Sequence, residues 1–157
     1  MQLRRHCLSM GLLALLLAGA AMAGPPLDLA VPPQAVRDQL AQIRRDLDDG
    51  KTYVEIGSEQ RHTVLAALQR IEGAYASADG TQLSEAAQVS VSDDQRAVNE
   101  ILTKARDDSR LICRRQAKVG SNMLTSQCMT VAQRRRAEEG GQKGLDDLRS
   151  RTYSKEL

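Results

Sequence analysis

Residues 110–130 read R-L-I-C-R-R-Q-A-K-V-G-S-N-M-L-T-S-Q-C-M-T. Gly120-Ser121 in the middle favours a two-residue turn of type II′, because glycine stands at its first central position. If this turn sets the register, paired residue numbers sum to 241 and Cys113 stands opposite Cys128. Counting from the turn places this pair at a hydrogen-bonded position, where Cα atoms lie roughly 5.5 Å apart, within disulfide reach. The stretch therefore predicts a disulfide-bridged β-hairpin.

The same register sorts the hairpin side chains onto two unlike faces. One face is mostly apolar, with Arg115 and Ser126 as exceptions, whereas the opposite face is polar. The members of the apolar face are Leu111, Cys113, Ala117, Val119, Leu124 and Cys128. Because a hairpin with one apolar face is expected to cover a core, we expect it to lie against helices.

The two cysteines are expected to form a structural disulfide. Closing a loop of about 15 residues contributes roughly 3 kcal/mol in the chain-entropy model. A redox pair is the alternative, but redox dithiols are typically C-x-x-C, and 14 residues separate these two. The two thiols and His62 could also be proposed as metal ligands, but a zinc site needs three or four ligands that converge on one point. We therefore expect no metal and no cofactor.

The pattern C-x6-G-S-x6-C-x-T, formed by Cys113, Gly120, Ser121, Cys128 and Thr130, resembles a motif of small uncharacterised exported proteins of proteobacteria. Arg114 after the first cysteine and the Gln-Arg-Arg run after Thr130 fit the resemblance, which covers residues 98–136. It implies export and a bridged hairpin. It implies no activity and no catalytic residues.

The first 23 residues have the layout of a secretory signal peptide. Arg4 and Arg5 precede an apolar run over residues 8–20, and an A-x-A site predicts cleavage between Ala23 and Gly24. The alternatives are an uncleaved anchor, for which the run is short, and a twin-Arg signal. We expect an exported protein, periplasmic or secreted, with no transmembrane segment after cleavage. The only cysteines left would be the hairpin pair.

Between this signal and the hairpin, apolar spacing predicts helices. Four prolines in residues 24–33 indicate a mobile tether, and residues 34–109 form the helical region. Helices are expected over 34–49, 58–78 and from the S-x-x-Q capping box at Ser92 to about Ala105, with 51–57 as loop. Residues 81–91 could continue a helical stripe. A second capping box at Thr130 starts a last helix, which is expected to break near Gly140.

Composition agrees with a mainly α fold of three or four helices around a thin core. The 157 residues include no Trp, no Phe and three Tyr, and the length is too short for a large barrel. Residues 24–109 hold 9 basic and 15 acidic side chains, whereas residues 110–157 hold 11 basic and 5 acidic. The chain is therefore split into an acidic helical region and a basic segment containing the hairpin and the last helix.

This basic segment suggests a binding function. Arg114, Arg115 and Lys118 are the candidate contacts with an anionic partner, such as an acidic protein or an envelope component. The alternative is that the basic segment folds back on the acidic helices of its own chain. Nucleic acid is not expected, because the protein is exported and no aromatic residue stands near the patch for base stacking.

An exported, non-enzymatic accessory or binding protein is therefore the expected class. A small periplasmic enzyme with an unrecognised site is the alternative. His62, the only histidine after the signal, has no marked nucleophile or carboxylate beside it in the sequence, as general base catalysis would need. No catalytic residue is assigned.

Overall fold

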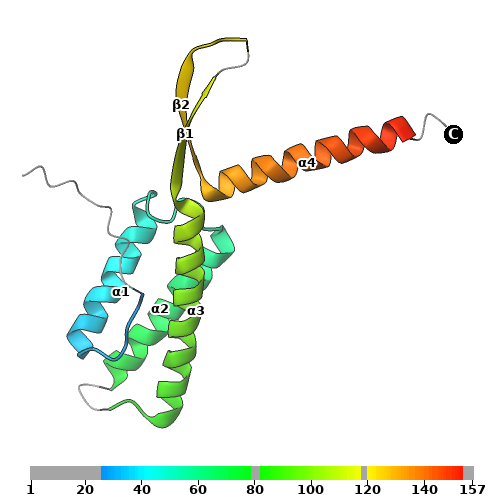
Figure 1. Cartoon of the computed structure of the whole chain (residues 1–157). Helices are drawn as coiled ribbons and strands as arrows, with labels where there is room; N and C mark the ends of the chain where they lie inside the picture. Colours follow the sequence, from blue (N-terminus) through cyan, green and yellow to red (C-terminus); the bar gives the residue numbers. More distant parts are fainter. Residues whose placement is uncertain (1–25, 79–81, 118–119, 154–157) are drawn as a thin grey trace, which may run out of the picture.

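Three helices, α1 (Pro33–Asp48), α2 (Ser58–Ser77) and α3 (Glu85–Ser109), enclose the core of the computed structural model. The structure describes residues 26–78, 82–117 and 120–153. Each helix turns a stripe of apolar side chains inward, as the 3.6-residue period requires. The buried residues of the three stripes are Val36, Leu40, Ile43, Leu47, Val64, Ala67, Leu68, Ile71, Val91, Val98, Leu102 and Ala105. We call these three helices the bundle (Figure 1).

The segment before α1 packs on the bundle, so the predicted tether is wrong for residues 26–32. Leu27 is only 2% exposed and belongs to the core. The side chain of Asn99 accepts a hydrogen bond from the Leu27 N–H at 2.7 Å and donates to its carbonyl at 2.9 Å, and Gln95 donates to the same carbonyl at 2.8 Å. Two amide side chains on α3 therefore hold the chain in place of a backbone partner.

Helix α3 is longer than the sequence indicates, and the predicted start at Ser92 is wrong. The helix begins at Glu85, and the hydroxyl of Ser84 accepts from the Ala87 N–H as its N-cap. Asp94, in the middle of α3, is buried, and its carboxylate accepts hydrogen bonds from Arg70 Nε at 2.9 Å and from Arg70 Nη2 at 2.5 Å. Asp94 thus joins α3 to α2.

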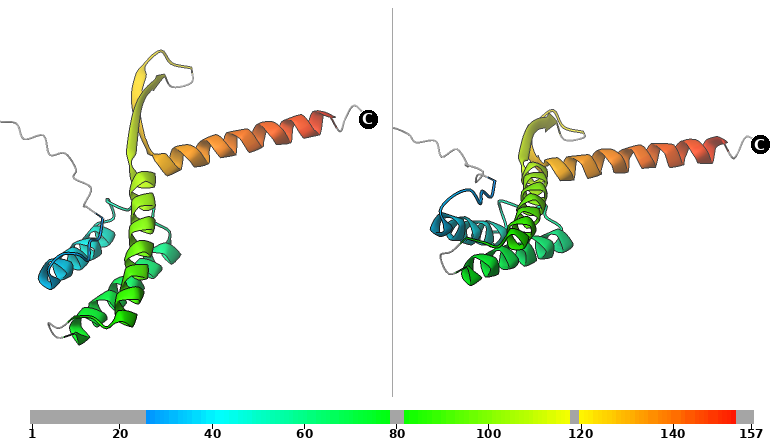
Figure 2. Two further views of the ribbon diagram at one scale, coloured as in Figure 1. Left: turned by 60° about the horizontal axis from the view of Figure 1, so that its bottom comes forward. Right: turned by 90° about the horizontal axis from the view of Figure 1, so that it is seen from below.

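The hairpin consists of β1 (Leu111–Ala117) and β2 (Leu124–Thr130), and it projects beyond the end of the bundle (Figures 1 and 2). Leu111 and Leu124, on its apolar face, remain 66% and 65% exposed. The expectation that the hairpin lies against the helices is therefore wrong. Only Arg110, with extended dihedrals, separates α3 from β1, so the chain has no loop with which to reverse onto the bundle.

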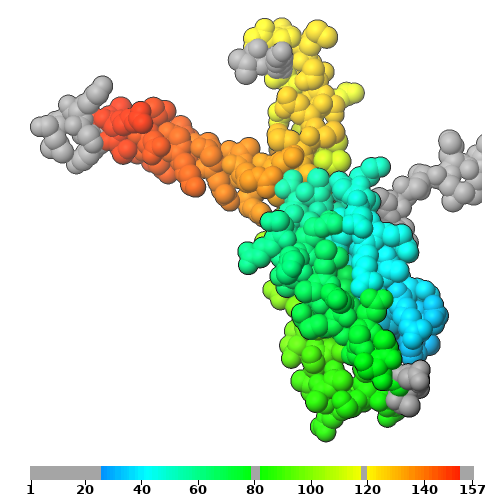
Figure 3. Space-filling model, turned by 180° about the vertical axis from the view of Figure 1, so that it is seen from behind, coloured from blue at the N-terminus to red at the C-terminus, as the bar shows by residue number. Residues whose placement is uncertain are grey.

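Helix α4 (Val131–Tyr153) leaves the base of the hairpin and extends away from the bundle (Figure 3). Only its first turn is partly covered, with Ala132 buried, and residues 135–152 are exposed. It runs without a break through Gly140, so the predicted break is wrong. A glycine costs about 1 kcal/mol relative to alanine, which weakens a helix without the steric block that a proline imposes.

Candidate functional site

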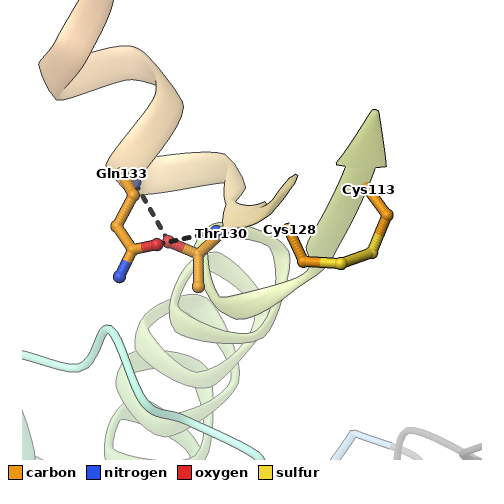
Figure 4. Close-up of a disulfide and its surroundings, with 4 residues drawn as sticks. All are labelled: Cys113, Cys128, Thr130 and Gln133. Carbon is orange, nitrogen blue, oxygen red and sulfur yellow. Dashed lines mark hydrogen bonds between the residues drawn. A yellow bond between two sulfur atoms is a disulfide. The ribbon is translucent and has the colours of Figure 1, made fainter. Parts of the chain in front are cut away.

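The predicted register of the hairpin is confirmed. Every pair in the antiparallel ladder, from Leu111 with Thr130 to Ala117 with Leu124, has residue numbers that sum to 241. Cys113 and Cys128 are opposite each other and form a disulfide (Figure 4). Both cysteines are exposed. The disulfide therefore ties the two strands together outside the core, rather than stapling the core itself.

The predicted hydrogen-bonding phase of the ladder is wrong by one position. The Val131 N–H donates to the Arg110 carbonyl at 3.0 Å, so these two residues are at a hydrogen-bonded position. Such positions alternate along the ladder, which makes Cys113 and Cys128 a non-hydrogen-bonded pair. Their Cα atoms are 4.0 Å apart, closer than the expected 5.5 Å. A two-residue turn at Gly120-Ser121 does not fit this phase, although Gly120 has a φ of +80°, which glycine adopts readily.

Thr130 connects the hairpin to α4 as the predicted capping box. Its hydroxyl accepts from the Gln133 N–H at 3.0 Å, and Gln133 Oε1 accepts from the Thr130 N–H at 3.1 Å (Figure 4). The same Thr130 hydroxyl donates to Glu55 Oε1 at 2.6 Å. Thr130 is buried, so this one residue ends the hairpin, caps α4 and contacts the turn between α1 and α2.

Glu55 is the anchor that sequence reasoning missed. It lies in the turn between α1 and α2, where its side chain is 9% exposed and its N–H donates to the Ser109 hydroxyl at 3.0 Å. Besides Thr130 it pairs with Arg136 at 2.8 Å. The donated hydrogen bond from Thr130, followed by that from Arg136, holds the pKa of the Glu55 carboxyl below its ordinary value. An acid between Val54 and Ile56 was the only sequence signal.

Two of the three arginines at the start of α4 pair with acidic residues of the helical region, residues 34–109. Arg135 donates to Asp108 at 3.0 Å, and Arg136 pairs with Glu55. Arg134 is half-buried, and its Nε has no hydrogen-bond partner in the described part of the chain. The alternative that the basic segment folds back on its own acidic helical region therefore holds for Arg135, which pairs with α3, and for Arg136, which pairs with the turn between α1 and α2.

The hairpin arginines are in a different situation. Arg114 and Arg115 are exposed, and neither forms an ion pair with any residue that the structure describes. They are opposite the uncharged Gln127 and Ser126. Lys118, the third predicted contact, lies outside the described residues. The geometry thus leaves two positive charges on a projecting element without a partner among residues 26–78, 82–117 and 120–153.

His62 is exposed on α2, and its side chain forms no hydrogen bond or ion pair with any residue that the structure describes. A depression of about 690 Å³ lies along α3, where Asp107 and Asp108 contribute to its lining together with Arg135 of α4. His62 does not line it. Asp108 is already paired with Arg135 and, at 3.9 Å, with Lys104.

Within the described ranges, no group of three His, Cys, Asp or Glu side chains could hold a metal ion. No helix there combines the length and the apolar character that crossing a membrane requires. The predicted signal peptide, with cleavage between Ala23 and Gly24, falls outside the described residues. The disulfide itself indicates an oxidising environment.

No protein-family model matches this chain, and no curated protein and no solved structure matches it significantly. The resemblance of residues 98–136 to small exported proteins stays a prediction. A function for the chain is therefore inferred from its own residues and geometry.

Proposed function

We propose that this protein is an exported, non-enzymatic binding protein that contacts an anionic partner through the basic hairpin. Arg114, Arg115 and Lys118 are the proposed contacts, and an acidic protein or another anionic envelope component is the proposed class of partner. Export is supported by the signal-type sequence of residues 1–23 and by the disulfide, which belongs to an oxidising compartment.

One contrast carries this proposal. Arg135 and Arg136 are satisfied by Asp108 and Glu55, whereas Arg114 and Arg115 face solvent on a disulfide-linked hairpin. Unpaired positive side chains on one projecting element attract an anionic partner and favour its orientation. The cross-link limits the conformations of the hairpin before binding, so less conformational entropy is lost when the partner binds.

The test is binding of the oxidised, signal-free protein to envelope fractions of its host at two salt concentrations. The hairpin variant carries Arg114→Gln, Arg115→Gln and Lys118→Gln. The matched control carries Lys143→Gln, Arg149→Gln and Arg151→Gln, at three exposed positions of α4, so the net charge is the same in both variants.

We expect the hairpin variant to lose binding at least tenfold and the α4 control to bind like the wild type. Binding of the wild type should weaken as salt rises, because exposed charges are screened. Equal losses in the two variants would point to net charge instead of the hairpin. Absence of wild-type binding would overturn the proposal.

A further inference from the structure

The outer edge of β1 is open to another strand. Among the residues that the structure describes, the sheet contains only β1 and β2, and every residue of β1 is exposed except the half-buried Ile112. The hydrogen bond between Val131 and Arg110 sets the phase of the ladder. In that phase the N–H and C=O groups of Cys113 and Arg115 point away from β2. An open edge of this kind is a template for strand pairing.

Arg114 and Arg115 project from the two opposite faces of this edge, because successive side chains of a strand alternate. A flat anionic surface, such as a membrane, can meet only one face of the hairpin at a time. An extended chain paired with β1 runs between the two faces. Its successive side chains can therefore place one carboxylate beside each guanidinium.

Building on the proposed function, we propose that the partner is an acidic segment of another protein that joins β1 as a third, antiparallel strand. Two adjacent acidic residues of this segment are opposite Arg114 and Arg115, where opposite charges on paired positions stabilise a sheet. The main-chain hydrogen bonds supply affinity, and the two carboxylates supply specificity.

The two open edges of the sheet differ in charge, and this difference favours β1 as the edge to which an acidic strand is added. Residues 124–130 of β2 carry no charged side chain, whereas β1 carries the two arginines. A second copy of this chain is a poor occupant, because β1 against β1 would bring arginines together and neither strand contains an acid. The occupant is therefore a different protein.

The hydrogen-bonding phase between β1 and β2 determines which residues of the added strand form hydrogen bonds with β1. The residue opposite Arg115 exchanges main-chain hydrogen bonds with it, and so does the residue opposite Cys113. On that same face Leu111 is 66% exposed, so an apolar residue fits opposite it. Read from the residue opposite Gln116, a fitting hexapeptide is Thr-Glu-Glu-Val-Thr-Val.

The test measures binding of this peptide, labelled with a fluorophore, to the oxidised signal-free protein by fluorescence anisotropy. One version is N-methylated at the first Glu and the first Val, whose N–H groups would donate to β1. The control version is N-methylated at the second Glu and the second Thr, whose N–H groups point away. Both versions keep all charges.

We expect the inward methylation to weaken binding at least tenfold and the outward methylation to change it less than threefold. The double variant Arg114→Gln with Arg115→Gln should lose the peptide, while the α4 control variant keeps it. Equal effects of the two methylations would overturn strand addition, as would no binding at about 1 mM peptide.

A second binding measurement uses vesicles of phosphatidylglycerol. It separates the strand-addition inference from the proposed function. If the vesicles bind through Arg114 and Arg115 while the peptide does not bind, the strand inference fails and the proposed function stands. If neither the peptide, the vesicles nor the envelope fractions bind, both fail. Peptide binding that depends on the inward N–H groups, with weaker vesicle binding, supports both.

Discussion

Leu68 and Ile71 in the bundle are completely buried, whereas Leu111 and Leu124 in the hairpin expose about two thirds of their surface. The bundle is held by apolar burial among three helices, with Leu27 added from the preceding segment. The hairpin is held by its ladder and by one disulfide. Two regions of one short chain are thus stabilised by different means.

This difference shows how a chain without Trp or Phe can hold a hairpin away from its core. A two-stranded hairpin alone is marginally stable in water, so it ordinarily needs a core to lie on. Here the cross-link replaces that core, and both faces and the β1 edge remain available. Changes to the bundle should therefore leave the hairpin intact, and the reverse should also hold.

The largest effect is expected from Leu68→Ala in the centre of the bundle. Removing a fully buried leucine side chain costs about 2–5 kcal/mol of unfolding free energy, through lost transfer energy and the cavity left behind. The matched control is Leu124→Ala in the hairpin, expected within about 0.5 kcal/mol of zero because its side chain is largely exposed. Chemical denaturation followed by circular dichroism measures both, and similar losses would contradict the comparison.

The second effect is expected from loss of the disulfide, which contributes about 3 kcal/mol of stability in the chain-entropy model and acts on the hairpin alone. Replacing Cys113 and Cys128 together by serine should open the ladder, because little else holds it. Amide hydrogen exchange should then speed up at Ile112, Arg114 and Gln116, whose N–H groups face β2, while Leu68 in α2 stays protected. Reduction of the wild type should reproduce this pattern. Faster exchange in α2 as well would place the hairpin and the bundle in one cooperative unit.

The hairpin register could be predicted because it depends on residues close in sequence. The position of Gly120-Ser121 and the spacing of the two cysteines indicated the same pairing. The Thr130 capping box and the α1 stripe are equally local, and the structure confirms both. The hydrogen-bonding phase was missed because it depends on how β1 leaves α3 at Arg110, which turn preferences do not encode.

The errors concern contacts between distant residues. Leu27 is held by Asn99, 72 residues away, and Asp94 by Arg70 on the neighbouring helix. Neither partner stands out in the sequence, because amide and guanidinium groups are common on helix surfaces. The role of Glu55 could not be predicted for the same reason, because its partner Thr130 lies 75 residues away. The unpaired state of Arg114 and Arg115 likewise required the placement of the hairpin beyond the bundle.

The smallest effect, about 1 kcal/mol, is expected from Glu55→Gln where the two regions meet. Glutamine can still accept the Thr130 hydroxyl but loses the stronger charge-assisted bonds of a carboxylate. The control is Glu59→Gln, at an exposed position in the first turn of α2. Its effect on unfolding free energy should be smaller.

The pH dependence of this contribution separates a charge effect from a packing effect. The pKa of Glu55 is lower in the folded protein than its ordinary value, which is about 4.3 in unfolded chains. The stabilisation is therefore complete above that ordinary value and is lost as the pH falls through the lowered one. Denaturation of wild type and Glu55→Gln between about pH 7 and pH 2 should show the two unfolding free energies converging at the acid end. A constant difference over the whole range would mean that Glu55 joins the hairpin to the bundle by shape and neutral hydrogen bonding, and that its charge contributes nothing.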